Sequence, residues 1–176
     1  MPIVPDDKNW TWVLERPCRD CGFVAENFEP ADTPSSIRAN AVRWQELLAH
    51  PNVRLRPNDS TWSALEYGCH VRDVFRLFNH RLERMLDEDA PQFANWDQDV
   101  TAIEERYSEQ NPAVVAAELA EAAEVLATTF ERVTLGDHER TGFRSDGAAF
   151  TIGSFARYLM HDPLHHVWDV EQGYDN

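Results

Sequence analysis

The sequence predicts an all-α protein, a four-helix bundle preceded by an irregular N-terminal extension. Four segments place apolar residues at the three- and four-residue spacing of helices that bury one face, and no segment alternates as a β-strand does. The connections between these segments differ widely in length, which bundles tolerate. A chain of 176 residues is the size of one domain. We therefore expect an extension over residues 1–33, packed on a bundle over residues 34–176.

The first two helices are predicted over residues 34–49 and from about residue 60 to residue 88. The first follows a Ser/Thr/Pro start signal, and its apolar face comprises Ile37, Ala41, Trp44 and Leu48. We expect Ser60 or Asp59 to cap the second helix. Its apolar stripe comprises Tyr67, Val71, Val74, Phe78, Leu82 and Met85.

The other two helices are predicted over residues 111–133 and about 150–171. Asn111 has the side chain of an N-cap, and Pro112 stands at the first helical position, where its missing N–H is not needed. Residues 88–111 are expected to form a loop with one short helix.

The charge balance argues against nucleic acid and anionic membranes as partners. The chain has 16 Lys and Arg against 31 Asp and Glu, a net charge of −15, and its basic residues are scattered. Nucleic-acid-binding proteins gain affinity by neutralising phosphates with a clustered basic surface. No apolar run approaches the roughly 20 residues that span a bilayer, and the first residues lack the layout of a secretory signal. We therefore expect a cytoplasmic protein.

Three cysteines are too few for a disulfide framework. Two of them, Cys18 and Cys21, form a CxxC pair in the segment RPCRDCGF. A structural zinc site usually needs four nitrogen or sulfur ligands, and no second CxxC follows. The pair is therefore interpreted first as two loop thiols, with half of a zinc site and a redox pair as the alternatives.

Three histidines have the spacing of metal ligands. His70 lies three residues after Tyr67 on the apolar stripe of the second helix, so its side chain is expected to face the core. On the last helix His161 and His165 are four residues apart and therefore lie one turn apart on one face. Together the three imidazoles would hold a divalent ion and leave a coordination position open, as in catalytic sites.

Two alternatives to this triad stay open. A histidine on an apolar face is commonly a hydrogen-bonded core residue. Pro163 stands between His161 and His165, and a proline inside a helix removes a hydrogen bond and strains the preceding turn. If the helix restarts there, His161 turns away from His165 and His166 becomes the partner. Asp162 would cap the new helix, or else orient a liganding histidine.

The segments WSALEYGCHVRDV and HDPLHHVWDV resemble motifs of the DinB/YfiT-like superfamily, whose fold is shared with mycothiol-dependent maleylpyruvate isomerases. The resemblance covers roughly residues 34–172. It implies a four-helix bundle in which His70, His161 and His165 hold a divalent metal ion. Zinc is the expected ion, with nickel or iron as alternatives, and a low-molecular-weight thiol such as mycothiol is the implied co-substrate.

The resemblance further implies a thiol-dependent S-transferase or isomerase that acts on a small-molecule electrophile. Two other functions stay open, namely a non-catalytic, stress-related protein whose metal stabilises the bundle, and a metal-dependent hydrolase. Arg140 and Arg144 are candidates for binding the thiol through bidentate contacts. Trp96 lies in a long loop that can cover the mouth of the site. A homodimer is a further expectation.

Overall fold

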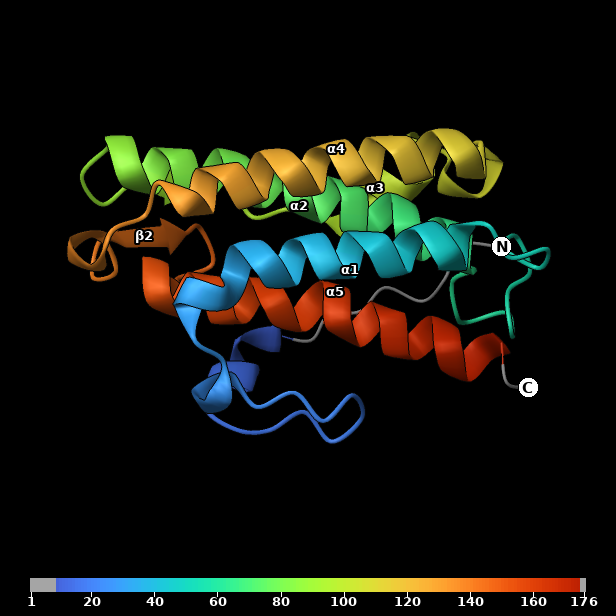
Figure 1. Ribbon diagram of the computed structural model, residues 1–176, viewed down its shortest axis with the longest axis horizontal. Coiled ribbons are helices and arrows are strands. Elements are labelled where there is room, and N and C mark those ends of the chain that lie inside the picture. Colours follow the sequence, from blue (N-terminus) through green and yellow to red (C-terminus); the bar gives the residue numbers. More distant parts are fainter. Residues whose placement is uncertain (1–8, 175–176) are drawn as a thin grey trace.

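The computed structural model describes residues 9–174, and its frame is a bundle of four long helices (Figure 1). These are α1 (Thr33–Leu48), α2 (Ala64–Asp87), α4 (Pro112–Glu131) and α5 (Ile152–Tyr174). Helix α4 packs on α1 and α2, and α5 packs on the same two helices from the other side. The predicted four-helix bundle is confirmed. None of the described helices is long and apolar enough to span a bilayer.

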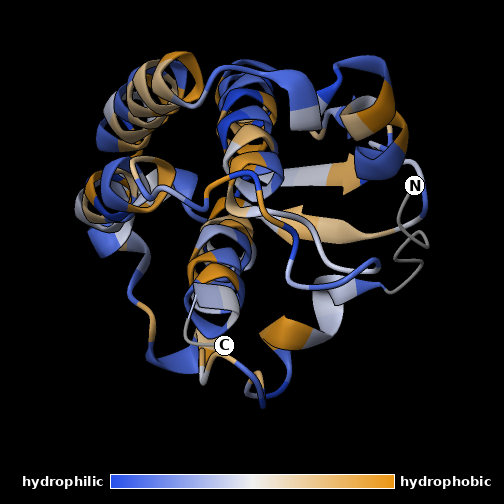
Figure 2. Ribbon diagram, turned by 90° about the vertical axis from the view of Figure 1, so that its right-hand side faces the viewer, coloured by the Kyte–Doolittle hydropathy of each residue, from blue (hydrophilic) through white to orange (hydrophobic). Residues whose placement is uncertain are grey.

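The predicted apolar faces form the core. All four residues of the α1 face are buried, and so is the α2 stripe apart from the half-buried Tyr67. Figure 2 views the molecule from one end, with the helices nearly end-on and the strands of a small sheet beside them. Because His70 continues the α2 stripe, its side chain is completely buried.

Two helix starts show how the local sequence sets the element boundaries. Asn111 caps α4 as predicted, because its Oδ1 accepts hydrogen bonds from the backbone N–H groups of Ala113 and Val114. The prediction that Ser60 or Asp59 caps α2 is wrong. Ser63 is the N-cap, since its hydroxyl and the Glu66 carboxylate form a reciprocal capping box.

A small three-stranded sheet corrects the prediction that the chain has no strands. Strand β1 (Gln92–Phe93) pairs in parallel with β2 (Thr141–Arg144), which pairs antiparallel with β3 (Ala149–Thr151). These strands have two to four residues, too few for an alternating pattern to be visible in the sequence. The sheet joins the long loop before α4 to the segment that enters α5. The loop also holds the short helix α3 (Gln98–Glu104).

Helix α5 runs without interruption through Pro163, so the alternative of a helix that restarts there is wrong. The ring of Pro163 is buried, and its carbonyl oxygen accepts a hydrogen bond from Asn40 Nδ2 of α1 at 3.0 Å. Asp162 is therefore an interior helix residue and not a cap. The four residues at 161, 162, 165 and 166 consequently keep regular helical positions on α5.

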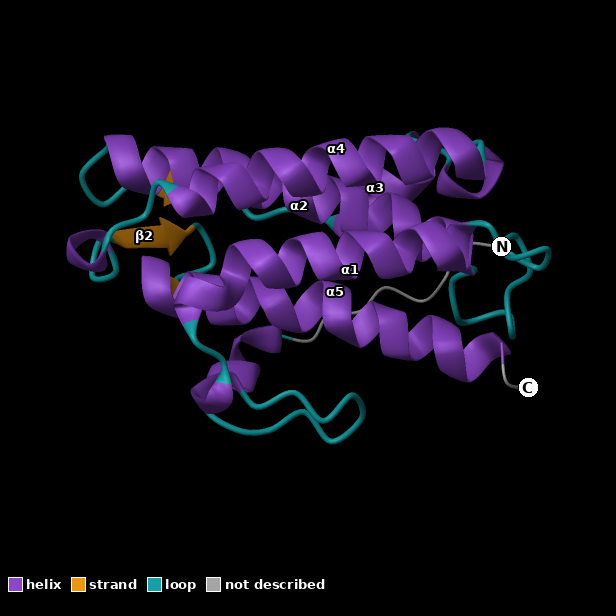
Figure 3. Ribbon diagram, viewed as in Figure 1, coloured by secondary structure: helices purple, strands orange, loops and turns teal. Residues whose placement is uncertain are grey.

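The N-terminal extension lies against α5 and consists of loops and short helical turns (Figure 3). Its 3-10 helices are η1 (Trp10–Leu14), η2 (Ala25–Asn27) and η3 (Pro30–Asp32). All three contact α5. The first eight residues of the predicted extension lie outside the described part of the chain.

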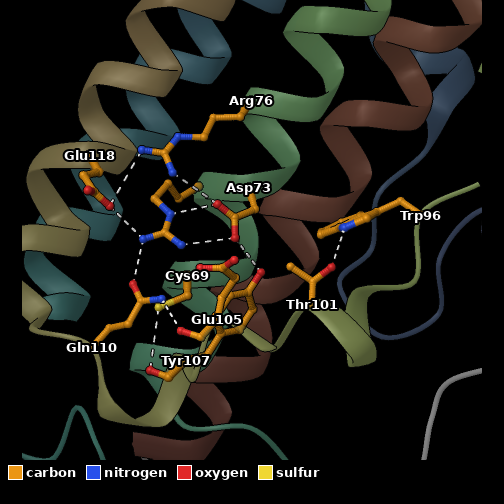
Figure 4. A network of polar contacts seen from close by, with 10 residues as sticks. Cys69, Asp73, Arg76, Trp96, Thr101, Glu105, Tyr107, Gln110 and Glu118 are labelled. Carbon is orange, nitrogen blue, oxygen red and sulfur yellow. Dashed lines mark hydrogen bonds and ion pairs between the residues drawn. The ribbon is translucent and has the colours of Figure 1, made fainter. Parts of the chain in front are cut away.

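A polar network ties the loop before α4 to the bundle (Figure 4). The buried Arg72 of α2 donates to Asp73 Oδ1 at 2.9 Å, and to Glu118 Oε2 and Gln110 Oε1 at 2.7 Å each. The Tyr107 hydroxyl donates to Asp73 Oδ2 at 2.6 Å. Because Tyr107 and Gln110 belong to the loop, these bonds fix the segment that presents Trp96 to the bundle.

Candidate metal centres

Helix α5 carries two pairs of candidate ligands that are offset by one residue. His161 and His165 form one pair, and Asp162 and His166 form the other, each with the four-residue spacing of neighbours on a helix face. A one-residue offset turns the second pair by about 100° around the helix axis. Among residues 9–174 there are accordingly two groups, in each of which the candidate ligand atoms lie within 4.8 Å of one another. One comprises His70, Asp162 and His166, and the other comprises Cys18, Cys21, His161 and His165.

The group of His70, Asp162 and His166 is centred on a carboxylate. His70 Nε2 lies 3.3 Å from Asp162 Oδ1 and 3.4 Å from Oδ2, and His166 Nε2 lies 3.8 Å from Oδ2. Two ligands held 2.0–2.2 Å from one ion in tetrahedral geometry are about 3.3–3.6 Å apart. The observed spacings are close to those of ligands that share one cation.

The protonation state of this group suits a cation as well. Burial opposes ionisation of Asp162, but the neighbouring His70 and His166 outweigh it and hold the pKa of the carboxyl below its ordinary value. Oδ1 of Asp162 is buried and has no hydrogen-bond partner within the described residues. The donor set of two imidazoles and one ionised carboxylate therefore fits a divalent metal ion.

Aromatic rings and one carboxylate hold these imidazoles in place. The Trp96 ring stacks on His70, with centroids 5.4 Å apart and an interplanar angle of 10°. Tyr67 lies against His166, with centroids 4.7 Å apart. His166 Nδ1 lies 2.9 Å from Asp169 Oδ2, a contact that directs its Nε2 toward Asp162.

The second group joins the N-terminal extension to α5. Cys18 Sγ lies 3.6 Å from His165 Nδ1, and both side chains are buried. The two cysteines come together in a tight turn, in which Cys18 N–H donates to Phe23 O at 2.8 Å and Gly22 N–H donates to Cys18 O at 3.1 Å. Gly22 has a φ of +75°, a conformation that favours glycine.

Burial favours the neutral forms of His161, His165 and Cys21 in the second group. It lowers the pKa of His161 to about 4, with a further contribution from His165, and it lowers the pKa of His165 as well. Burial also raises the pKa of the Cys21 thiol to about 11. A redox-active CxxC pair needs a thiol pKa below its ordinary value. The raised pKa therefore argues against Cys21 as the attacking thiol of such a pair.

A pocket opens beside both groups. Asp162, His166, His161 and His165 reach it from α5, and the remaining walls come from α2, the loop before α4, β2 and η1. Its apolar wall is formed by Val74, Leu77 and Phe78, and its other side chains include Trp10, Asn95, Trp96, Gln98 and Tyr158. Two arginines, Arg81 and Arg144, also line it.

The arginine pair gives the pocket a local positive charge in an acidic protein. Burial, with a contribution from Arg144, lowers the pKa of Arg81 to about 10. Arg81 Nη2 donates to Ala94 O at 2.8 Å, whereas its buried Nε has no partner within the described residues. Arg144 pairs with Asp146 at 2.8 Å and donates to the Tyr158 hydroxyl at 3.1 Å. An anionic group of a ligand can therefore gain a charge-assisted hydrogen bond here.

The predicted site residues do not form one site but divide among the two ligand groups, the pocket and, for Arg140, the end of α2. No group of mutually close ligand atoms within the described residues combines His70 with His161 or His165, so the single triad stays a prediction that the arrangement does not favour. Arg144 and Trp96 line the pocket, whereas Arg140 does not. The guanidinium of Arg140 instead donates to the carbonyl oxygens of Met85 and Glu88 at the end of α2.

Sequence reasoning gave too little weight to three sets of residues. Asp162 and His166 have the same four-residue spacing as His161 and His165. The CxxC pair lacked a visible partner because its partners lie more than 130 positions away. Arg81 lies between Phe78 and Leu82 of the apolar stripe, and a charged residue in that position was the signal for the pocket.

Comparisons with known proteins agree with the fold. No curated protein matches the chain significantly. A solved structure, described as "YfiT from Bacillus subtilis is a probable metal-dependent hydrolase with an unusual four-helix bundle topology", superposes with a TM-score of 0.71 at 15% identity. That superposition covers 99% of this chain and 94% of the other. The model of the DinB superfamily matches residues 29–170, and the chain therefore belongs to the DinB superfamily.

Proposed function

We propose that this protein is a metal-dependent, thiol-using S-transferase or isomerase whose catalytic ion is held by His70, Asp162 and His166. The observation that carries the proposal is a group of three ligands beside a pocket whose other imidazoles, those of His161 and His165, belong to the second ligand group. Three protein ligands leave a position for an incoming ligand atom, as in catalytic sites. The spacing within the group and its ionised carboxylate support a divalent ion.

The lining of the pocket favours a thiol over water as the nucleophile. Hydrolysis needs a general base within reach of the attacking water. Among the described residues, the only carboxylate and imidazole groups that line the pocket are members of the two ligand groups. A bound divalent cation would stabilise the thiolate form of a coordinated thiol, so that its proton can leave to solvent.

The other side chains of the pocket suit the remaining parts of the two substrates. Arg81 and Arg144 would bind an anionic or hydroxyl-rich part of the thiol. Val74, Leu77 and Phe78 would exclude water from the electrophile. Trp96, which stacks on His70, would hold that ligand in position and cover one side of the site. Arg140 has no place in this proposal because its guanidinium is bound to main-chain oxygens of α2.

The donor set narrows the choice of ion. Two histidines and one carboxylate form catalytic zinc sites and also non-haem iron sites. We propose zinc, because thiol activation needs a Lewis acid and no change of oxidation state. Nickel and ferrous iron are the alternatives that elemental analysis of the purified protein would reveal.

The test compares thiol conjugation with hydrolysis in the metal-loaded protein. Monochlorobimane serves as the electrophile, with mycothiol, bacillithiol and glutathione as thiols, and a p-nitrophenyl ester reports hydrolysis. His70→Ala should abolish conjugation and remove one metal equivalent. His80→Ala, which changes an exposed histidine of the same helix, should do neither.

Each outcome decides between the candidate functions. Conjugation that depends on His70 supports the proposal. Ester turnover without conjugation would favour a hydrolase, the second candidate. The superposed structure is described as that of a probable metal-dependent hydrolase, which supports this candidate. If chelation lowers only the melting temperature and neither substrate reacts, the ion has a stabilising role and the proposal is wrong.

A further inference from the structure

We propose that Cys18, Cys21, His161 and His165 form a second metal site, a structural zinc centre that fastens the N-terminal extension to α5. The site is distinct from the group of His70, Asp162 and His166 and does not depend on the function proposed for that group. Its ligands come from two segments separated by more than 130 residues.

The donor set is the first argument. Two cysteines and two histidines are a common ligand set of structural zinc, and four protein ligands leave no position for a substrate. The spacings are those of zinc ligands too, since the cysteines form a CxxC pair and the histidines lie four positions apart. All four candidate ligand atoms lie within 4.8 Å of one another.

The separation between Cys18 Sγ and His165 Nδ1 also fits a zinc ion. Zinc binds sulfur at about 2.3 Å and imidazole nitrogen at about 2.0–2.1 Å, so tetrahedral geometry places these two ligands about 3.6 Å apart. Cys18 Sγ and His165 Nδ1 are 3.6 Å apart. The two cysteines are free thiols in the structure, so both sulfur atoms are available as ligands.

A buried nitrogen without a partner is the third argument. His161 is only 3% exposed, and its Nε2 has no hydrogen-bond partner within the described residues. An unsatisfied buried polar atom costs free energy, and a cation among the four side chains would remove that cost. His165 points Nδ1 at Cys18, and its Nε2 lies 3.7 Å from Asp169 Oδ1, so a carboxylate stands near the other nitrogen of this imidazole.

The surroundings explain what the ion would do for the fold. Rings of Trp10, Trp12 and Phe23 from the extension lie 5.6, 6.1 and 5.7 Å from the His161 ring, measured between centroids. The described part of the extension has only short 3-10 helices and loops of its own, so few backbone hydrogen bonds hold it in place. A zinc ion bound from both sides would link this segment to α5 and would keep Trp10 at the wall of the pocket.

The experiment measures zinc content and the spectrum of the cobalt-substituted protein. We expect two zinc equivalents in the wild type, one of which is lost in Cys18→Ser and in Cys21→Ser. Cobalt in the wild type should give a sulfur-to-metal charge-transfer band, which both variants lose. Cys69→Ala removes the remaining cysteine, which lies outside the group, and should leave the band unchanged.

Two further measurements distinguish this site from the group of His70, Asp162 and His166. His70→Ala should remove the other zinc equivalent and retain the charge-transfer band. Hydrogen exchange in residues 9–32 should accelerate in Cys21→Ser, whereas Asp20→Ser, a change between the two cysteines, should leave it as in the wild type.

The wild-type spectrum alone tests the site if a cysteine variant fails to fold. A charge-transfer band typical of two thiolate ligands in a tetrahedral cobalt site supports the proposal. Reduced wild-type protein that binds cobalt without such a band, or that binds no metal, would overturn it, and so would a Cys18–Cys21 disulfide in protein purified under reducing conditions.

Discussion

His166 Nδ1 lies 2.9 Å from Asp169 Oδ2, one turn further along α5. The other oxygen of the same carboxylate, Oδ1, lies 3.7 Å from Nε2 of His165. His165 and His166 are consecutive in the chain, yet they belong to different ligand groups. The carboxylate of Asp169 is therefore at hydrogen-bond distance from an imidazole of one group and lies beside an imidazole of the other, so the two proposed metal sites share a neighbouring residue.

The first prediction follows from this shared carboxylate. Asp169→Asn keeps the shape of the side chain but removes its charge, which weakens the orientation and the basicity of both imidazoles. Loss of such a supporting carboxylate typically lowers metal affinity about 10- to 100-fold. We expect a decrease of that size at the site of His166 and a smaller decrease at the site of His165, measured by competition with a chromophoric chelator.

Glu171→Gln is the matched control for Asp169→Asn. Glu171 lies on the same helix and pairs with Arg43 of α1 at 2.8 Å, outside both ligand groups. Its substitution should leave both affinities unchanged. Equal affinities in Asp169→Asn and the wild type would contradict the role of Asp169.

The bundle was predictable because burial imposes a period on the sequence. The α2 stripe from Val71 to Met85 is buried as its spacing predicts, and Asn111 and Pro112 mark the start of α4. The sheet was not predictable, because its strands are short and are defined by partners distant in sequence. The start of α2 was misplaced because several residues before it can cap a helix, and only the Ser63–Glu66 pair forms the reciprocal box.

The site was predictable only in part. Spacing identified α5 as the helix that bears most of the candidate ligands. Two pairs of residues four positions apart overlap on that helix, and their spacing does not distinguish them. Which pair faces His70 depends on the rotation of α5 about its axis, and tertiary contacts such as the hydrogen bond from Asn40 to the Pro163 carbonyl contribute to that rotation. The role of the CxxC pair depends in the same way on how the extension crosses α5.

The second prediction concerns the arginine-lined part of the pocket, which would bind an anionic group of the thiol. Arg81→Met keeps the apolar stem but removes a buried guanidinium whose Nε has no partner within the described residues. A hydrogen bond to a charged group contributes about 1.5–3 kcal/mol. The dissociation constant of a carboxylate-bearing thiol such as bacillithiol should therefore rise about 10- to 100-fold in a calorimetric titration.

Arg132→Met, an exposed change at the end of α4, is the control and should bind the same thiol as the wild type does. If Arg81→Met binds with unchanged affinity, the anionic part of the thiol lies elsewhere and the pocket assignment is wrong.

The third prediction concerns the network that fixes the loop before α4. Tyr107→Phe removes the hydrogen bond to Asp73 Oδ2 and leaves that half-buried carboxylate with fewer donors (Figure 4). The free energy of unfolding should fall by about 1.5–3 kcal/mol, because the acceptor is charged. Tyr174→Phe removes a bond to the neutral carbonyl of Leu47 and should cost only about 1 kcal/mol in the same urea titration. Equal losses in the two variants would contradict a special contribution from the network.

The last prediction is a pH dependence at the start of α2, measured in chelator to keep metal binding out of the comparison. Glu66 is buried, which alone would raise its pKa, but Arg56 and Ser63 outweigh burial and lower the pKa below its ordinary value of 4.5. A carboxyl with a lowered pKa in the folded state stabilises the fold above its unfolded pKa, and this stabilisation is lost as the pH falls through the folded pKa. Glu66→Gln should therefore be about 2 kcal/mol less stable than the wild type at pH 7, as expected for loss of a largely buried ion pair. That difference should shrink as the pH falls below about 4.5.

Glu121→Gln, on the exposed face of α4, is the control and should stay within about 0.5 kcal/mol of the wild type at every pH. If the stability difference of Glu66→Gln does not change with pH, the Glu66 side chain contributes through its shape and not through its charge.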